Sequence, residues 1–370
     1  MTRSKTEAAG KFTPVAPTRA IAQGRCQGGG AENADPRGVT QTTGAFLALE
    51  HQADLLFHRL DVPFDVRKGE QLIVHQPHHD RRHGVVDLGP FVQVAQALRQ
   101  AGLNGPPVLE CDAEQGFVLL GDLGRELYLA ALQAADAARA DALMRDAIAA
   151  LVQWQLKMPA DTLPPYDEAL LARELALFPD WCVQREFGLQ WGDAERARWQ
   201  SVCRALIDSA LAQPTVAVHR DWMPRNLMVA TPNPGILDFQ DAVRGPVSYD
   251  LASLLRDAFI SWDEEREIDW AVRYWNAARR AGVPLGEPMA ADFGEFWRAL
   301  EWMGLQRHLK VLGIFCRLKH RDGKPAYAAD LPRFFAYATK VAMRYAPLRP
   351  LLSLLEPMSG IKPTQAFSMR

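Results

Sequence analysis

The chain has 370 residues, of which 48% are apolar and 23% charged, and its formal net charge is −2. Such a composition is that of a globular enzyme with roughly two domains, and the near-zero charge argues against nucleic acid as a partner. Its five cysteines, odd in number and never spaced as CxxC, argue against a disulfide framework and a zinc site and indicate a reducing compartment.

Residues 1–42 lack hydrophobic periodicity and include the run Gly28–Gly30, so we expect a disordered tail. No apolar run in this segment is long enough for a signal peptide. The longest apolar-rich stretch, residues 127–158, is interrupted by charges such as Arg139 and Asp146 and therefore predicts an amphipathic helix rather than a membrane span. We expect a cytoplasmic protein with no membrane partner.

Residues 43–122 predict a small mixed α/β lobe. Residues 71–74 and 116–120 each have the pattern of a strand. Between them, apolar residues recur at helical spacing before Gly102 ends the helix. These residues are Phe91, Val94, Ala95 and Leu98.

Residues 123–356 predict a larger, mostly helical lobe, followed by a C-terminal tail at 357–370. Helical spacing is clear around residues 144–152, through residues 166–212 and from residue 250 to about residue 345. One β-rich segment interrupts these helices. Its predicted strands are residues 215–218, 227–229 and 235–239. Together, the two parts of the chain predict an α+β fold.

The β-rich segment carries the polar residues that phosphoryl transfer needs. Asp221 lies on a loop between strands, where a carboxylate can accept the proton of an attacking hydroxyl. Asn226 follows five residues later and Asp238 ends the third strand, and their oxygen atoms suit a magnesium ion. His219 is expected to brace the loop through hydrogen bonds rather than to join the chemistry.

An isolated HxD pair is more often a surface ion pair or a helix cap than part of a catalytic loop. The full pattern here is more specific, because HxDxxxxN is followed by a turn and an apolar strand that ends in Asp238-Phe-Gln. At these residues the chain resembles the aminoglycoside phosphotransferase and choline kinase superfamily, which is related to the protein kinases. Residues 219–228 and 235–256 are most similar to one branch, the anomeric sugar kinases.

This resemblance covers about residues 85–350 and implies a bilobal protein-kinase-like fold that uses ATP and Mg²⁺. It implies that Asp221 is the base, that Asn226 and Asp238 are metal ligands, and that Asp250 braces the catalytic loop from the following helix. It also implies a hinge whose backbone contacts adenine, although an ordinary strand-to-helix turn is the alternative. The hinge residues would be Leu120, Gly121, Asp122 and Leu123.

The chain departs from the superfamily pattern in its small lobe. Most relatives pair a lysine on the third strand with a glutamate on the next helix, whereas His75 and Phe91 lie near those places here. Residues 44–84 also differ from the segment that covers the nucleotide in the sugar-kinase branch. The run 75–83 holds four of the nine histidines, and its irregular spacing favours a solvated loop over a metal site.

Four charged residues are candidates for binding the acceptor. Asp241 and Arg244 follow the predicted metal aspartate, and an exposed ion pair between them is the alternative. Arg307 and Lys310 lie three residues apart on a late helix, where they either recognise a carboxylate or form a solvated face. Trp222 is expected either to stack on a sugar ring or to lie in the core, and the same holds for Trp302.

The leading hypothesis is an ATP-dependent kinase for the 1-hydroxyl of an amino sugar such as N-acetylmuramate or N-acetylglucosamine, acting in cell-wall sugar recycling. A kinase for aminoglycosides or other small alcohols is the first alternative. A pocket rich in Arg256, Arg307 and Lys310 would speak against a cationic antibiotic. The second alternative is a nucleotide-binding module without activity, because the small lobe is irregular.

Overall fold

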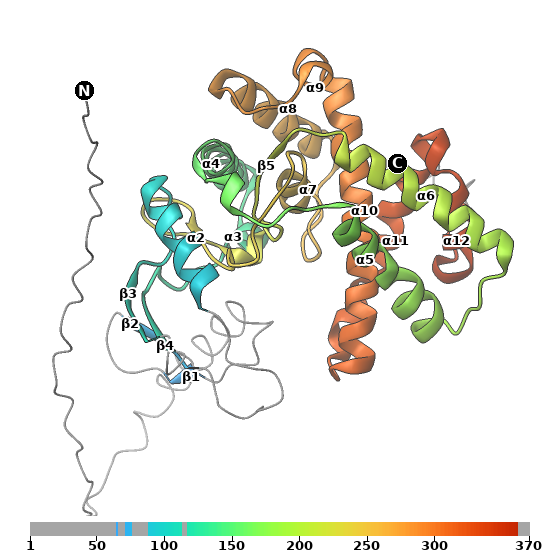
Figure 1. The fold of residues 1–370 in the computed structure, drawn as a ribbon, viewed down its shortest axis with the longest axis horizontal. Helices are drawn as coiled ribbons and strands as arrows, with labels where there is room; N and C mark the ends of the chain where they lie inside the picture. The colour runs from blue at the N-terminus through green and yellow to red at the C-terminus, as the bar shows by residue number, and fades with distance from the viewer. Residues whose placement is uncertain (1–63, 66–70, 76–87, 113–116, 362–370) are drawn as a thin grey trace, which may run out of the picture. The chain divides into compact units, whose positions relative to one another are not determined.

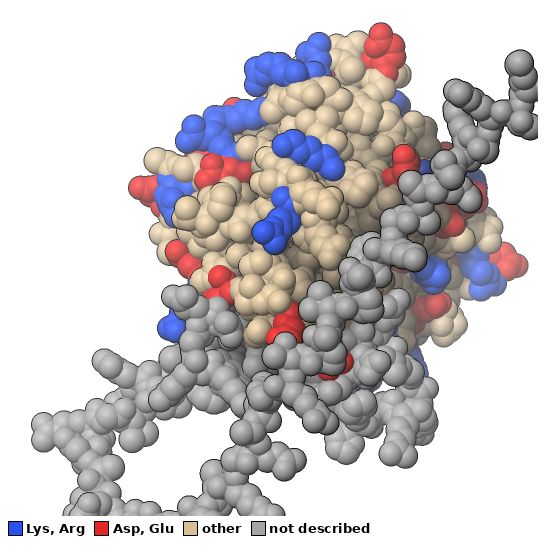
Figure 2. All heavy atoms as spheres, turned by 60° about the vertical axis from the view of Figure 1, so that its left-hand side comes forward, with Lys and Arg blue, Asp and Glu red and all other residues tan. Residues whose placement is uncertain are grey.

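The computed structural model describes residues 64–65, 71–75, 88–112 and 117–361. The predicted tail at 1–42 and most of the histidine-rich run lie outside these ranges. In the described part of the chain, no helix is both long and apolar enough to cross a membrane. On the face in Figure 2, basic and acidic side chains are interspersed over a largely uncharged surface.

An antiparallel sheet with the strand order β1-β2-β4-β3 begins the described chain (Figure 1). Its strands are β1 (Phe64–Asp65), β2 (Gln71–His75), β3 (Val108–Asp112) and β4 (Phe117–Gly121). The predicted strands at 71–74 and 116–120 are confirmed as β2 and β4. The pattern missed β3, because Glu110 and Asp112 break its apolar run and the strand is largely exposed.

Helix α2 (Gly89–Gln100) crosses from β2 to β3 and confirms the predicted helix. Its four apolar residues at helical spacing are buried, as the sequence pattern required. The helix ends before Gly102, whose φ of +73° is a left-handed conformation that glycine adopts without steric penalty. The aromatic ring of Phe91 stacks on Phe239 with 5.0 Å between ring centroids, which joins α2 to the segment that follows Asp238.

The rest of the chain is mainly helical, as predicted. Its helices include α3 (Tyr128–Ala134), α4 (Ala137–Lys157), α5 (Glu168–Leu177), α6 (Asp193–Leu211), α7 (Tyr249–Leu255), α8 (Glu264–Ala281), α9 (Glu287–Ala291), α10 (Phe293–Arg321), α11 (Leu331–Arg344) and α12 (Pro350–Ser359). Short 3-10 turns are η1 (Ala160–Thr162), η3 (Pro224–Asn226), η4 (Pro325–Asp330) and η5 (Ala346–Leu348), and η2 (Phe178–Glu186) is a π-helix. The predicted lobe boundary at residue 356 falls inside α12.

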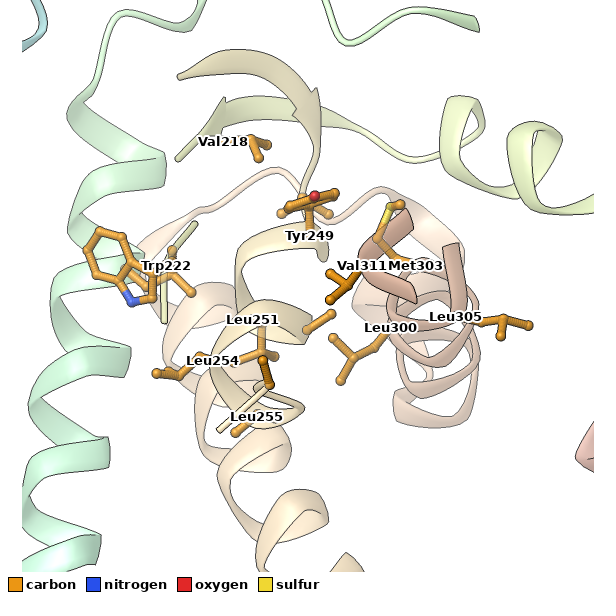
Figure 3. Packing of buried hydrophobic residues seen from close by; sticks show 14 of the residues in the cluster. Val218, Trp222, Tyr249, Leu251, Leu254, Leu255, Leu300, Met303, Leu305 and Val311 are labelled. Atoms are coloured by element: carbon orange, nitrogen blue, oxygen red, sulfur yellow. The ribbon is translucent and has the colours of Figure 1, made fainter. Parts of the chain in front are cut away.

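Helix α10 organises this helical part, because it packs against α5, η2, α6, α7 and α11 (Figure 1). Figure 3 shows leucines of α7 beside residues of α10, with Leu251, Leu254 and Leu300 among them. Trp222 is fully buried in this core, which excludes the sugar-stacking alternative for its ring. The ring of Trp302 packs against Tyr345, the residue that follows α11.

The β-rich segment forms two separate ribbons rather than one group of three strands. Strand β5 (Thr215–Val218) pairs with β8 (Val243–Pro246), and β6 (Leu227–Met228) pairs with β7 (Gly235–Ile236). The predicted strand at 235–239 therefore ends early, and β8 was not predicted. The β5–β8 ribbon joins stretches that are distant in the chain, whereas β6 and β7 form a tight hairpin. The loops that follow β5 and β7 lie close to each other, because Asn226 bonds to both Asp221 and Asp238.

His308 of α10 provides a test of how burial affects stability. Its ring is fully buried, stacks on Tyr337, and has Nε2 3.3 Å from the carbonyl oxygen of Arg256. Burial, together with the charge of Arg256, lowers the pKa of His308 to about 3. The unfolded chain takes up this proton below about pH 6.5, so the neutral ring contributes stability above that pH that is lost on acidification toward pH 3.

We expect His308→Gln to lower the free energy of unfolding at pH 8. The difference in this free energy between the variant and wild type should narrow as the pH falls. Linkage for one histidine with these two pKa values gives a narrowing of about 2 kcal/mol between pH 8 and pH 5. Urea unfolding of both proteins at pH 8, 6.5 and 5 measures this difference directly. A difference that stays constant over the three pH values would contradict the burial of an uncharged ring.

Candidate active site

Asp250, in the first turn of α7, holds the loop that follows β5. Both oxygen atoms of Asp250 accept backbone hydrogen bonds, Oδ2 from the N–H of His219 at 2.7 Å and Oδ1 from the N–H of Arg220 at 3.0 Å. The carboxylate is fully buried, and this burial raises the pKa of Asp250 to about 7. Asp250 thus lies in the bracing position that the sequence led us to expect.

The three residues predicted for the chemistry lie together, with the Asn226 side chain bonded to the backbone of Asp221 and to the side chain of Asp238. The amide nitrogen Nδ2 of Asn226 lies 2.9 Å from the carbonyl oxygen of Asp221 and 3.3 Å from Oδ2 of Asp238. Gln240 donates from Nε2 to the other carboxylate oxygen of Asp238 at 2.7 Å. The strand–turn–strand between Asn226 and Asp238 is the β6–β7 ribbon, and it folds these two side chains back onto each other.

Two residues of this site have unusual backbone conformations. Arg220 has a φ of +74° and Asp238 a φ of +59°, and they are the non-glycine residues with positive φ in the described part of the chain. Left-handed conformations are unfavourable for residues with a side chain and cluster at functional sites. The hydrogen bond from the Arg220 N–H to Asp250 holds the first of them in place.

His219 braces the loop from inside the core. Its ring packs against Trp154 and Trp222, at centroid distances of 5.2 Å and 5.5 Å, and Nδ1 accepts the backbone N–H of Asp221 at 3.3 Å. Burial lowers the pKa of His219 to about 4, so the ring is neutral at physiological pH and Nδ1 can act as an acceptor. This geometry fits a structural role for His219.

A cavity of about 810 Å³ opens beside this loop, between α2, α5, α10 and the segment after Asp238. Of the four residues predicted to bind the acceptor, Asp241 and Lys310 line it, whereas Arg244 and Arg307 do not. The Arg244 side chain is 43% exposed and pairs with Asp161 at 3.2 Å. The other charged residues that line the cavity are Arg173, Glu174, Arg220 and Arg317.

Two of the expected residues face elsewhere. Arg307 is buried, and its Nη2 lies 3.7 Å from Oδ1 of Asp221. Arg256, one of the three cations that would speak against a cationic antibiotic if they lined the pocket, is instead buried between Glu267 and Glu301 at 3.1 Å and 3.0 Å. The helical spacing of Arg307 and Lys310 could not distinguish these directions, because neighbouring turns of α10 contact different elements.

The inner wall of the cavity contains a buried polar network centred on Glu174 of α5. Glu174 lies 2.9 Å from Nζ of Lys310 and 2.6 Å from Nη2 of Arg220, and it also accepts hydrogen bonds from Tyr166 and Gln306. Burial opposes its charge, but the two cations lower the pKa of Glu174 to about 2. The carboxylate is therefore ionised and ties α5 and α10 to the catalytic loop.

Glu174 and Gln240 were not predicted from the sequence. A signal existed for Glu174, because it occupies the buried face of α5 together with Leu171 and Leu175. A charged residue at such a position needs buried partners, although the sequence does not say which ones.

The predicted hinge forms the end of β4 and the turn that follows. Leu120 is fully buried, and the backbone N–H of Gly121 donates to the carbonyl oxygen of Pro107 at 2.9 Å. Asp122 caps the turn by accepting the N–H of Gly124 at 2.8 Å. Because the Gly121 N–H already has a partner, a donor to adenine would have to come from Asp122 or Leu123.

Residues 33–291 match the sequence profile of the phosphotransferase enzyme family. The chain belongs to this family and is a kinase.

Among named proteins, the N-acetylmuramate/N-acetylglucosamine kinase of Pseudomonas putida is 53% identical over 267 residues, which cover 72% of this chain and 76% of that protein. The kinase of the same name from Pseudomonas aeruginosa is 50% identical over 269 residues, covering 73% and 78%. The structure is also similar to a choline/ethanolamine kinase family protein from Mesorhizobium loti, with a TM-score of 0.51 at 14% identity over 83% of this chain and 98% of that chain. These similarities confirm the predicted bilobal α+β fold.

Proposed function

We propose that this chain transfers the γ-phosphoryl group of ATP to the 1-hydroxyl of an amino sugar such as N-acetylmuramate or N-acetylglucosamine. The observation that carries the proposal is the convergence of Asp221, Asn226 and Asp238 next to a cavity large enough for a sugar. Relatives at 53% and 50% identity are named N-acetylmuramate/N-acetylglucosamine kinases, which supports an amino sugar as the acceptor. We place the reaction in the cytoplasm, in the recycling of cell-wall sugars.

The catalytic loop supplies the groups for a proton transfer and an in-line attack. Asp221 accepts the proton of the acceptor hydroxyl and orients its oxygen toward the γ-phosphorus. Asn226 and Asp238 would hold Mg²⁺. The amide nitrogen of Asn226 bonds to Asp238, so its amide oxygen and the neighbouring carboxylate would be the oxygen ligands that a hard cation prefers. When bound, the ion neutralises phosphate charge. The backbone of Asp122 and Leu123 is proposed to bind adenine.

The charge of the cavity favours an acidic acceptor. Four cations and two carboxylates line it among the described residues, which leaves an excess of two positive charges. N-acetylmuramate carries a carboxylate that such a wall attracts, whereas a cationic aminoglycoside would be repelled. This observation places the antibiotic kinase second, even though Arg256 and Arg307 are not part of the lining.

Arg173 allows the acceptor assignment to be tested, because it is exposed, lines the cavity and lies outside the Glu174 network. We expect Arg173→Gln to raise the KM for N-acetylmuramate by about tenfold, the effect of losing one charged contact, while the KM for N-acetylglucosamine stays within about twofold. Steady-state kinetics with both sugars measure the ratio. Arg198→Gln, which removes an exposed arginine of α6, is the matched control.

A phosphate-transfer screen with ATP and Mg²⁺ over amino sugars, aminoglycosides and choline tests the function as a whole. Transfer to N-acetylmuramate, with the product assigned by phosphorus NMR as the 1-phosphate, is the expected result. Transfer to an aminoglycoside alone would reject the sugar assignment. Nucleotide binding without a product from any acceptor would favour an inactive module.

A further inference from the structure

The guanidinium of Arg307 points toward the catalytic loop instead of the acceptor cavity. Its Nη2 lies 3.7 Å from Oδ1 of Asp221 and 3.7 Å from the sulfur of Met223. The side chain is almost completely buried, with 4% of its surface exposed. A buried arginine contributes a fixed positive charge, and its planar group has few orientations once it is bonded.

Helix α7 fixes this guanidinium from a second side. Nε of Arg307 donates to Oγ of Ser253 at 2.7 Å, and that hydroxyl in turn donates to the carbonyl oxygen of Tyr249 at 3.2 Å. The Arg307 backbone thus belongs to α10, its side chain is bonded to α7, and its guanidinium reaches the loop that carries Asp221. These contacts restrain the position of the guanidinium independently of any substrate.

Buried carboxyl groups surround the Arg307 guanidinium. Asp250 and Asp257 are both fully buried, and burial raises the pKa of Asp250 to about 7 and that of Asp257 to about 6. The charge of Arg307 acts in the opposite direction on both carboxyl groups. Asp221 interacts electrostatically with Asp250, and the Arg307 guanidinium lies 3.7 Å from the Asp221 carboxylate.

We propose that Arg307 is a positioning residue for Asp221: anchored by Ser253, its guanidinium restrains the Asp221 carboxylate in one orientation beside the acceptor. This inference rests on the proposed function, in which Asp221 is the base. It replaces direct contact with the acceptor as the role of Arg307. A restrained base should affect the rate of the chemical step more than the affinity for the acceptor, since small displacements of reacting groups lower rates strongly.

The test compares Arg307→Met, Arg307→Lys and Ser253→Ala in steady-state kinetics with the accepted sugar. We expect kcat to fall about 100-fold in the methionine variant and about tenfold in the serine variant, with the acceptor KM within about twofold of wild type. Lysine keeps the charge and should restore part of the rate. Arg298→Met, which removes an exposed arginine from the same helix, should leave kcat unchanged.

If the methionine variant does not fold, as judged by thermal unfolding, the lysine and serine variants decide the outcome. An unchanged kcat with a raised KM in these variants would return Arg307 to acceptor binding and overturn the proposal. A wild-type protein that transfers no phosphate would instead reject the proposed function. In that case, a double-mutant cycle of Asp221→Asn and Arg307→Lys still tests the contact, with the thermal unfolding midpoint of each variant as the measurement. We expect the shift of the double variant to differ from the sum of the two single shifts. Additive shifts would show that Arg307 does not restrain Asp221 and would overturn the proposal.

Discussion

Replacing Asp221 with asparagine is expected to lower the rate of phosphoryl transfer by a factor of about 10² to 10⁴, the usual contribution of a positioned general base. Asparagine has nearly the same shape as aspartate but cannot accept a proton at neutral pH. The loop should keep its conformation, because the bond from Asn226 goes to the backbone carbonyl of Asp221 and because Asp250 holds the two preceding N–H groups.

This prediction concerns kcat, so the variant must be shown to be folded and to bind substrate. Its far-UV circular dichroism spectrum and its affinity for nucleotide should match those of wild type. Asp208→Asn, which removes an exposed carboxylate from α6, is the matched control and should keep full activity. If the Asp221 variant turns over at the wild-type rate, another group accepts the proton and the assignment of the loop is wrong.

The sequence predicted the centre of the site because its residues are close together in the chain. Asp221, Asn226 and Asp238 lie within 18 positions, and a tight β-ribbon is enough to bring them together. The buried face of α2 was likewise predictable, since helical spacing alone determines which of its residues share a side.

The contacts that could not be predicted join segments far apart in sequence. Glu174 meets Lys310 across 136 positions of the chain, and Arg307 meets Asp221 across 86. Helical periodicity places Arg307 and Lys310 on the same side of α10, but the packing of α7 and α5 decides that one faces the catalytic loop and the other the cavity. Strand β8 was missed for a similar reason, because its partner β5 lies 25 residues earlier, with the β6–β7 ribbon between them.

Gly313 of α10 marks the place where this long helix comes closest to a neighbour. A methyl group built on its Cα would lie 2.4 Å from both the carbonyl carbon and the carbonyl oxygen of Leu177, which joins α5 to the π-helix η2. No rotation of a side chain can relieve a clash with backbone atoms. The same part of α10 carries Ile314 and Arg317 into the cavity, so this contact also sets the position of one cavity wall.

We expect Gly313→Ala to destabilise the protein by about 3 kcal/mol, the upper part of the range for overpacking a core. Gly304→Ala on the same helix is a demanding control, because its methyl group would meet Ala252 and Arg256 at 3.8 Å, an ordinary contact distance. Alanine should stabilise the helix there by as much as about 1 kcal/mol. Urea unfolding should therefore show a lower free energy of unfolding for the Gly313 variant and a higher one for the Gly304 variant. A Gly313 variant as stable as wild type would show that α10 and the end of α5 are not in such close contact.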